Sequence, residues 1–61
     1  MDEKEYIELQ NLLTKLRVKN LKMIGLPKTD QSGRNKYYKI IRCIDFIRNN
    51  ALVEIEGEIY K

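Results

Sequence analysis

The sequence contains no histidine and no tryptophan, and it has one cysteine, Cys43, and one proline, Pro27. Without histidine, the chain lacks the most common metal ligand and general base. A single cysteine cannot form a disulfide within the chain, which favours a reducing, cytoplasmic location. No Ser/His/Asp, Cys/His or phosphate-loop pattern is present. We therefore expect a protein that is not an enzyme and that holds neither a cofactor nor a metal.

Long hydrophobic runs are also missing. No stretch approaches the roughly 18 apolar residues that a membrane span requires, and the N-terminal MDEKEYIEL is too acidic for a signal peptide. With 43% hydrophobic residues, 34% charged residues and a mean hydropathy of -0.55, the composition is that of an ordinary soluble protein. A chain of this length buries only about 60% of its unfolded surface. The sequence predicts one small domain over residues 1–61, with no membrane partner.

The charges are strongly segregated along the chain. Residues 11–48 contain ten basic and two acidic side chains, whereas residues 1–10 and 49–61 have net charges of -3 and -2. The formal net charge of +3 therefore conceals a basic middle of +8. Such a cluster is typical of proteins that bind polyanions, because each Lys or Arg near a phosphate releases condensed counterions.

The apolar residues indicate helices over most of the chain. A first helix is expected over residues 2–16, where apolar residues recur at steps of three and four and acidic residues occupy the first turn. Residues 17–24 have an offset apolar stripe, so they form either a short second helix or a bent continuation of the first. Gly25 and Pro27 then favour a stop.

A polar loop is expected over residues 28–35, followed by a third helix over about 34–50. The apolar stripe of this helix consists of Tyr37, Ile40, Ile41, Ile44, Ile47 and Ala51. At 100° per residue, the opposite face carries Asn35, Lys39, Arg42, Phe46 and Asn49. Lysine and arginine on this face suit phosphate contacts, and the asparagines suit base edges or the backbone. Phe46 either joins that surface, stands alone on a solvated face, or packs under the C-terminal segment.

The last eleven residues, ALVEIEGEIYK, predict a β element. Val53, Ile55 and Ile59 alternate with glutamates in the period of a strand. The segment either folds as a hairpin about Glu56 and Gly57, or forms one strand that pairs with a second copy in a homodimer. The expected fold is thus mostly α with a small C-terminal β element: three helices plus a terminal hairpin or strand.

Two family resemblances fit this pattern. IDFIRNNALVEIEGEIYK resembles the close of a winged helix-turn-helix domain, and VKNLKMIGLPKTD is similar to the second helix and turn of such domains. The resemblance implies that the third helix enters the major groove with Asn35, Lys36, Lys39 and Arg42. The wing would carry three glutamates that repel phosphate, which implies a structural or dimerising wing. LKMIGLP followed by SGRNKYYKIIRC also resembles the SAP helix-extended loop-helix motif, whose members bind duplex DNA through the same region.

Together these patterns predict a small protein that binds duplex DNA, of the kind that regulates transcription or replication in phages, viruses or plasmids. The expected contacts come from Lys22, Lys28, Arg34, Asn35, Lys36, Lys39 and Arg42. Such a protein would lie in the cytoplasm, or in the nucleoid or nucleus when bound to DNA. The main alternative is a protein-binding inhibitor or adaptor that uses an acidic strand edge and the aromatics Tyr38, Phe46 and Tyr60. A purely structural or oligomerising module is a third hypothesis.

Overall fold

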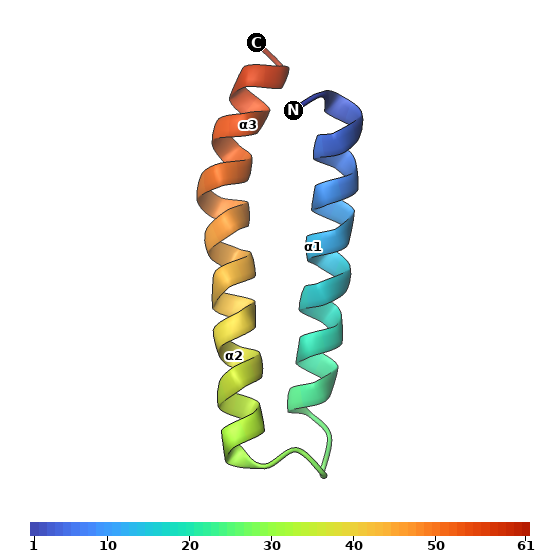
Figure 1. The fold of residues 1–61 in the computed structure, drawn as a ribbon, viewed down its shortest axis with the longest axis vertical. Helices are drawn as coiled ribbons and strands as arrows, with labels where there is room; N and C mark the ends of the chain where they lie inside the picture. The colour runs from blue at the N-terminus through green and yellow to red at the C-terminus, as the bar shows by residue number, and fades with distance from the viewer.

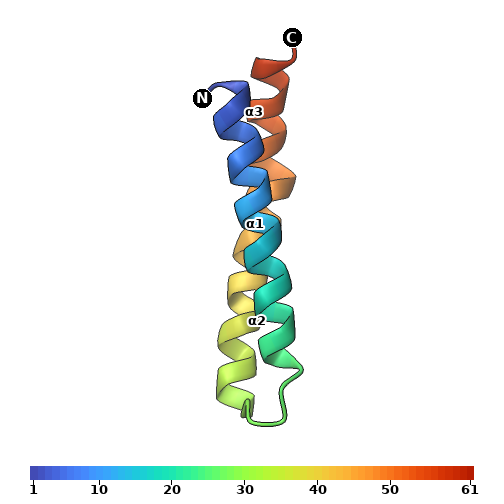
Figure 2. The same cartoon turned by 90° about the vertical axis from the view of Figure 1, so that its right-hand side faces the viewer.

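The computed structural model describes all 61 residues, and its regular elements are all helical (Figure 1). Helix α1 spans Glu3–Ile24, and α2 spans Gln31–Phe46. A π-helical turn, η1, covers Ile47–Ala51 and leads directly into α3, Leu52–Ile59. The two arms of this hairpin lie side by side and run antiparallel, and Figure 2 shows the same pairing from the side. The molecule is a rod of 46 × 17 × 12 Å with both termini at one end.

Local sequence signals set the helix ends near the termini and the connection. The Asp2 carboxylate accepts a hydrogen bond from the Glu5 amide at 2.8 Å, and the Glu5 side chain accepts one from the Asp2 amide at 3.4 Å. This capping box starts α1. Asp30 starts α2 by accepting a bond from the Gly33 amide at 2.7 Å. Pro27 lies in the connection between them.

Helix α1 continues without a break through Arg17, so residues 17–24 are a continuation of the first helix, and the alternative of a separate second helix is wrong. Its buried residues are Tyr6, Leu13 and Asn20, which recur every seven positions and therefore keep one line of contact with the other arm. Asn20 is tolerated in this line because its side-chain amide donates to the Leu16 carbonyl at 2.6 Å. Of the apolar residues that appeared offset after Leu16, Val18 and Leu21 are exposed, and Val18 lines a shallow hollow with Lys15, Lys19 and Lys22 on the outer side of α1.

The predicted C-terminal strand or hairpin is also wrong, because residues 52–59 form α3. The segment satisfies two periods at once: Leu52, Ile55 and Ile59 are spaced by three and four positions, as on one side of a helix. A helix satisfies its own backbone hydrogen bonds, whereas no second strand exists in the chain. Gly57 has no positive φ and makes no turn. The predicted homodimer through a C-terminal strand is therefore also wrong, because the chain has no such strand.

The π-helical turn keeps the second arm in register with α1. Ile41 and Ile44 are buried before the turn and Leu52 after it, and Leu52 follows Ile44 by eight positions. A regular repeat would need seven. The turn accommodates the extra residue, as π-bulges do, and the Asn50 side chain donates to the Phe46 carbonyl at 2.9 Å. Apolar residues on both sides of η1 therefore face α1.

The resulting core is small. Tyr6, Leu13, Ile44 and Leu52 form one buried cluster, against which Leu9, Ile47, Ile55 and Ile59 pack. We call this line of contact between the arms the seam. Only six of the 61 residues are buried, and no side chain is below 2% exposure. None of the helices combines the length and the hydrophobicity that crossing a membrane would demand.

The assignment of residues 52–59 to a helix predicts that Gly57→Ala stabilises the protein. A Cβ at Gly57 would meet nothing within 4 Å, and the backbone there is already one that alanine adopts. The gain in unfolding free energy should be about 0.5–1 kcal/mol, because glycine is a poor helix former. Thermal unfolding followed by circular dichroism measures it. A clear loss of stability would instead indicate a turn with positive φ at Gly57.

The role of η1 predicts that deleting Asn50 is tolerated. The deletion restores a seven-residue spacing between Ile44 and Leu52, so the free energy of unfolding should stay the same or rise. Deleting Asn11, also an exposed asparagine, removes a residue from the regular α1. It should cost about 3 kcal/mol or more, because Tyr6 is rotated out of the seam. Urea unfolding of both variants measures the difference, and equal losses would contradict this role of η1.

Candidate nucleic-acid interface

Because the two arms are antiparallel, the basic and acidic side chains lie mostly at opposite ends of the rod. Residues 15–46, here called the loop half, hold nine basic and two acidic side chains, a net charge of +7. The remaining residues, the termini half, hold three basic and seven acidic side chains, a net charge of -4. Both acidic segments meet in the termini half because the two chain ends lie together (Figure 1). The sequence segregation thus becomes a separation of charge along the long axis.

All seven predicted nucleic-acid contacts lie in the loop half. Lys22 is in the last turn of α1 and Lys28 is in the connection. The other five belong to α2: Arg34, Asn35, Lys36, Lys39 and Arg42. All are exposed except Arg34, which is half-buried.

The predicted residues divide over several faces of the loop half. Asn35, Lys39 and Arg42 line one shallow hollow together with Tyr38. Lys22 belongs to α1, where Lys15, Lys19 and Lys22 recur at steps of four and three and share the surface that points away from α2. The interpretation of the sequence missed Lys15 and Lys19, although this spacing was visible in it. The cations therefore surround the loop half instead of forming one flat face.

Most of these cations are free of ion pairs. The single ion pair of the protein joins Arg17 Nε to Asp45 Oδ1 at 2.9 Å, across the two arms. The terminal glutamates lie at the other end of the rod and neutralise none of the loop-half cations. Arg34 differs from the rest, because its Nε is buried without a hydrogen-bond partner. Its guanidinium is thus less available to a ligand than the exposed lysines are.

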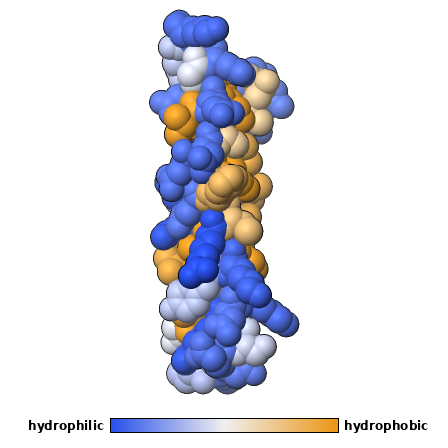
Figure 3. All heavy atoms as spheres, turned by 90° about the vertical axis from the view of Figure 1, so that its left-hand side faces the viewer, coloured by the Kyte–Doolittle hydropathy of each residue, from blue (hydrophilic) through white to orange (hydrophobic).

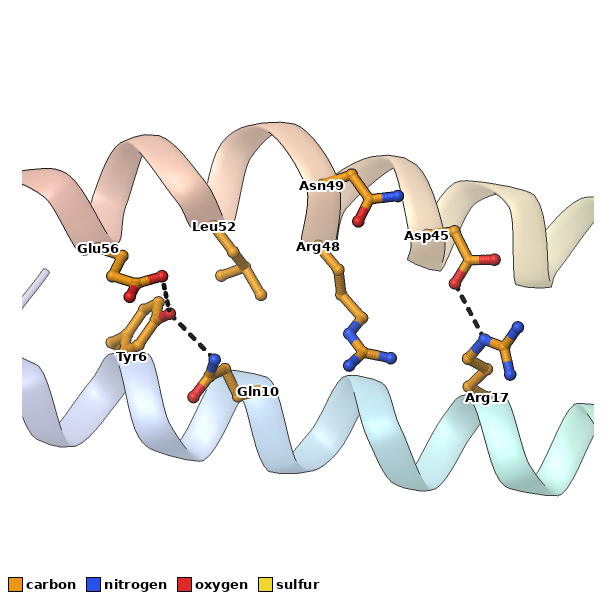
Figure 4. A pocket seen from close by; sticks show the side chains of 8 residues that line it. All are labelled: Tyr6, Gln10, Arg17, Asp45, Arg48, Asn49, Leu52 and Glu56. Atoms are coloured by element: carbon orange, nitrogen blue, oxygen red, sulfur yellow. Dashed lines mark hydrogen bonds and ion pairs between the residues drawn. The ribbon is translucent and has the colours of Figure 1, made fainter.

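One side of the rod carries a polar groove of about 440 Å³ between the arms (Figure 4). Its eight lining residues are Tyr6, Gln10, Arg17, Asp45, Arg48, Asn49, Leu52 and Glu56. In Figure 4, Arg48 reaches from the second arm toward α1 between the other side chains. Two arginines and two carboxylates share the groove, so its charges balance. It holds the arms together and does not favour a ligand of either sign.

Two tyrosines tie the chain ends together. The Tyr6 hydroxyl donates to Glu56 at 3.2 Å and accepts from the Gln10 side-chain amide at 3.0 Å. The Tyr60 hydroxyl donates to Glu3 at 3.2 Å, and the two rings meet edge to face with centroids 6.1 Å apart. Desolvation, followed by the hydrogen bond to Glu56, raises the pKa of Tyr6. Desolvation and the charge of Glu3 raise the pKa of Tyr60.

The aromatics of the alternative protein interface do not share a surface. Tyr38 and Phe46 lie two turns apart on α2, with 50% and 68% of their surface exposed. Tyr60 lies at the opposite end of the rod, against Tyr6. The acidic strand edge does not exist, because Glu54, Glu56 and Glu58 belong to α3.

No family model, curated protein or solved structure gives a significant match to this chain. No group of three or more His, Cys, Asp or Glu side chains is placed to hold a metal ion. The assignment of function therefore depends on the geometry and charge of the hairpin itself.

The tyrosine contacts predict a specific loss of stability in alkali. Folding favours the neutral phenols, since both folded pKa values are raised above 10.0. The contribution is fully present below pH 10.0 and is lost as the pH rises through the folded pKa values. Tyr6→Phe removes one of these groups, so its thermal midpoint should fall less steeply as the pH rises above 10.0.

Tyr38→Phe is the matched control, because it removes an exposed phenol that makes no hydrogen bond. It should retain the alkaline dependence of the unsubstituted protein. Thermal unfolding at a series of pH values compares the three proteins. An unchanged slope in Tyr6→Phe would show that the Tyr6 contacts do not form.

Proposed function

We propose that this protein binds duplex DNA through phosphate contacts made by the loop half. The observation that carries the proposal is a net charge of +7 on this half, where eight of the nine basic side chains make no ion pair. Unpaired surface cations are the groups that displace condensed counterions from a phosphate backbone. The negative termini half would be repelled by the same backbone, so the rod approaches DNA with its loop half first.

The width of the hairpin favours backbone contacts over the reading of bases. The rod measures 17 × 12 Å across, whereas the major groove, about 12 Å wide, admits one helix with its side chains. Asn35 is predicted to contact base edges or the backbone, and its side-chain oxygen already accepts a hydrogen bond from Gln31 at 3.0 Å. A two-helix rod with no wing and no separate recognition helix is suited to binding that depends weakly on sequence.

Lys39 and Arg42 are the central residues of the proposed contact. Both are exposed, both line the hollow on α2, and neither forms an ion pair. Arg42 can contact phosphate oxygens with two parallel N–H groups, whereas lysine acts as a point charge. Lys22 and Lys28 lie on other faces of the loop half, at the end of α1 and in the connection, and add to its positive charge.

The proposal predicts binding to a mixed-sequence duplex that weakens steeply with salt. The logarithm of affinity should fall against the logarithm of salt concentration with a slope of about -0.9 for each phosphate contacted. Replacing both Lys39 and Arg42 with alanine should flatten this slope by nearly two units and weaken binding at least about tenfold at low salt. Fluorescence anisotropy of a labelled duplex measures both quantities.

The matched control replaces Lys4 and Lys61 with alanine. This pair also lowers the net charge by two, but it lies in the termini half. It should leave the slope unchanged and alter the affinity only slightly. If both double variants lose the same affinity for DNA, binding depends on total charge and not on the loop half. If the unsubstituted protein does not bind the duplex at low ionic strength, the proposed function is excluded.

A further inference from the structure

One side of the seam is apolar and uncovered. With 100° of rotation per residue, six residues fall on the side opposite the polar groove, here called the apolar flank: Leu9, Leu12, Leu16, Ile40, Ile47 and Ile55. Leu12, Leu16 and Ile40 have 52%, 39% and 43% of their surface exposed, and the other three are half-buried. Figure 3 shows hydrophobic residues along the middle of the rod, with hydrophilic residues toward both ends.

The accessible surface of the hairpin is too large for a chain of its mass. A folded monomer of 7.3 kDa is expected to expose about 4,200 Å², whereas this chain exposes 4969 Å². The excess is roughly 800 Å², which is the area that each partner buries in an interface of standard size. One additional contact of this size would bring the protein to the usual surface for its mass.

The distribution of charge around the apolar flank favours a second copy of this chain as the partner, because two antiparallel copies have complementary charges. The flank lies in the middle of the rod, between a positive and a negative half. Rotating one copy end over end therefore places apolar flank on apolar flank and each loop half beside the termini half of the other copy. A dimer with both copies pointing the same way would instead place +7 beside +7.

The charged borders of the flank match the same arrangement. Lys19 and Lys36 border the flank in the loop half, and Glu5 and Glu8 border it in the termini half. All four side chains are exposed, and none takes part in an ion pair within the chain. After the end-over-end rotation, α1 of one copy faces α1 of the other, so Lys19 lies near Glu8 of the other copy, while Lys36 lies at the same end as its Glu5 but on the second arm.

We propose that two copies of this chain pack through their apolar flanks, antiparallel to each other, into a four-helix bundle. Such an interface is isologous, because the same patch is buried on both copies. Lys39 and Arg42 lie outside the flank and stay exposed, so the two loop halves are presented at opposite ends of the bundle. The dimer is independent of DNA binding: either property can fail while the other holds.

The first test is the mass of the protein in solution, measured by sedimentation equilibrium over a range of concentrations. The unsubstituted chain should be a dimer that dissociates on dilution. Leu12→Gln should raise the dissociation constant at least about tenfold, because each dimer loses two apolar contacts. Leu21→Gln is the matched control: the same substitution in the same helix, at 44% exposure, on the side opposite Leu12.

The control should leave the dissociation constant unchanged. Ile40→Gln tests the flank from the other arm and should behave as Leu12→Gln does. A monomer at every concentration would overturn the proposal, even if the monomer bound another protein. Equal effects of Leu12→Gln and Leu21→Gln would overturn the choice of surface.

The second test determines the direction of the two copies. Replacing Lys19 and Lys36 with glutamate should weaken self-association, because glutamates then face glutamates. Replacing Glu5 and Glu8 with lysine should weaken it in the same way. An equimolar mixture of the two double variants should form a heterodimer, since opposite charges meet again. Failure of the mixture to associate would exclude the antiparallel arrangement.

Discussion

Two helices can bury side chains only along the line where they touch, and this constraint shapes the whole molecule. The seam here is closed by Tyr6 and Leu13 from α1 with Ile44 and Leu52 from the other arm. These contacts fix the antiparallel direction and set the register of the arms. They also explain the π-helical turn, without which one residue too many would lie between Ile44 and Leu52.

The seam then determines where the remaining residues go. Because the arms are antiparallel, both acidic chain ends meet and the basic middle surrounds the connection. Because the seam is narrow, apolar side chains beside it stay partly exposed. One side of the seam became a polar groove held by Tyr6, Glu56 and the Arg17–Asp45 ion pair. The opposite side is the apolar flank, which is lined by leucines and isoleucines. This difference between the two sides of the seam is the basis of the proposed dimer.

The sequence predicts much of the first two thirds of the fold. The acidic first turn of α1, the stop around Gly25 and Pro27, and the apolar stripe of α2 each have one physical meaning. The C-terminal segment does not, because Leu52, Ile55 and Ile59 suit a helix while the alternating glutamates suit a strand. Its contact with Tyr6, fifty positions away, selects the helix. The basic cluster was visible in the sequence, but its placement around the rod depends on how the arms pair.

The most direct measurement of this account is a nuclear Overhauser experiment on the aromatic rings of Tyr6 and Tyr60. Mixing isotope-labelled and unlabelled chains separates contacts within one chain from contacts between copies. The closed seam places the two ring centroids 6.1 Å apart, so cross-peaks between their protons are expected within a single chain. Their absence, or their appearance only between different copies, would contradict a hairpin that closes on itself.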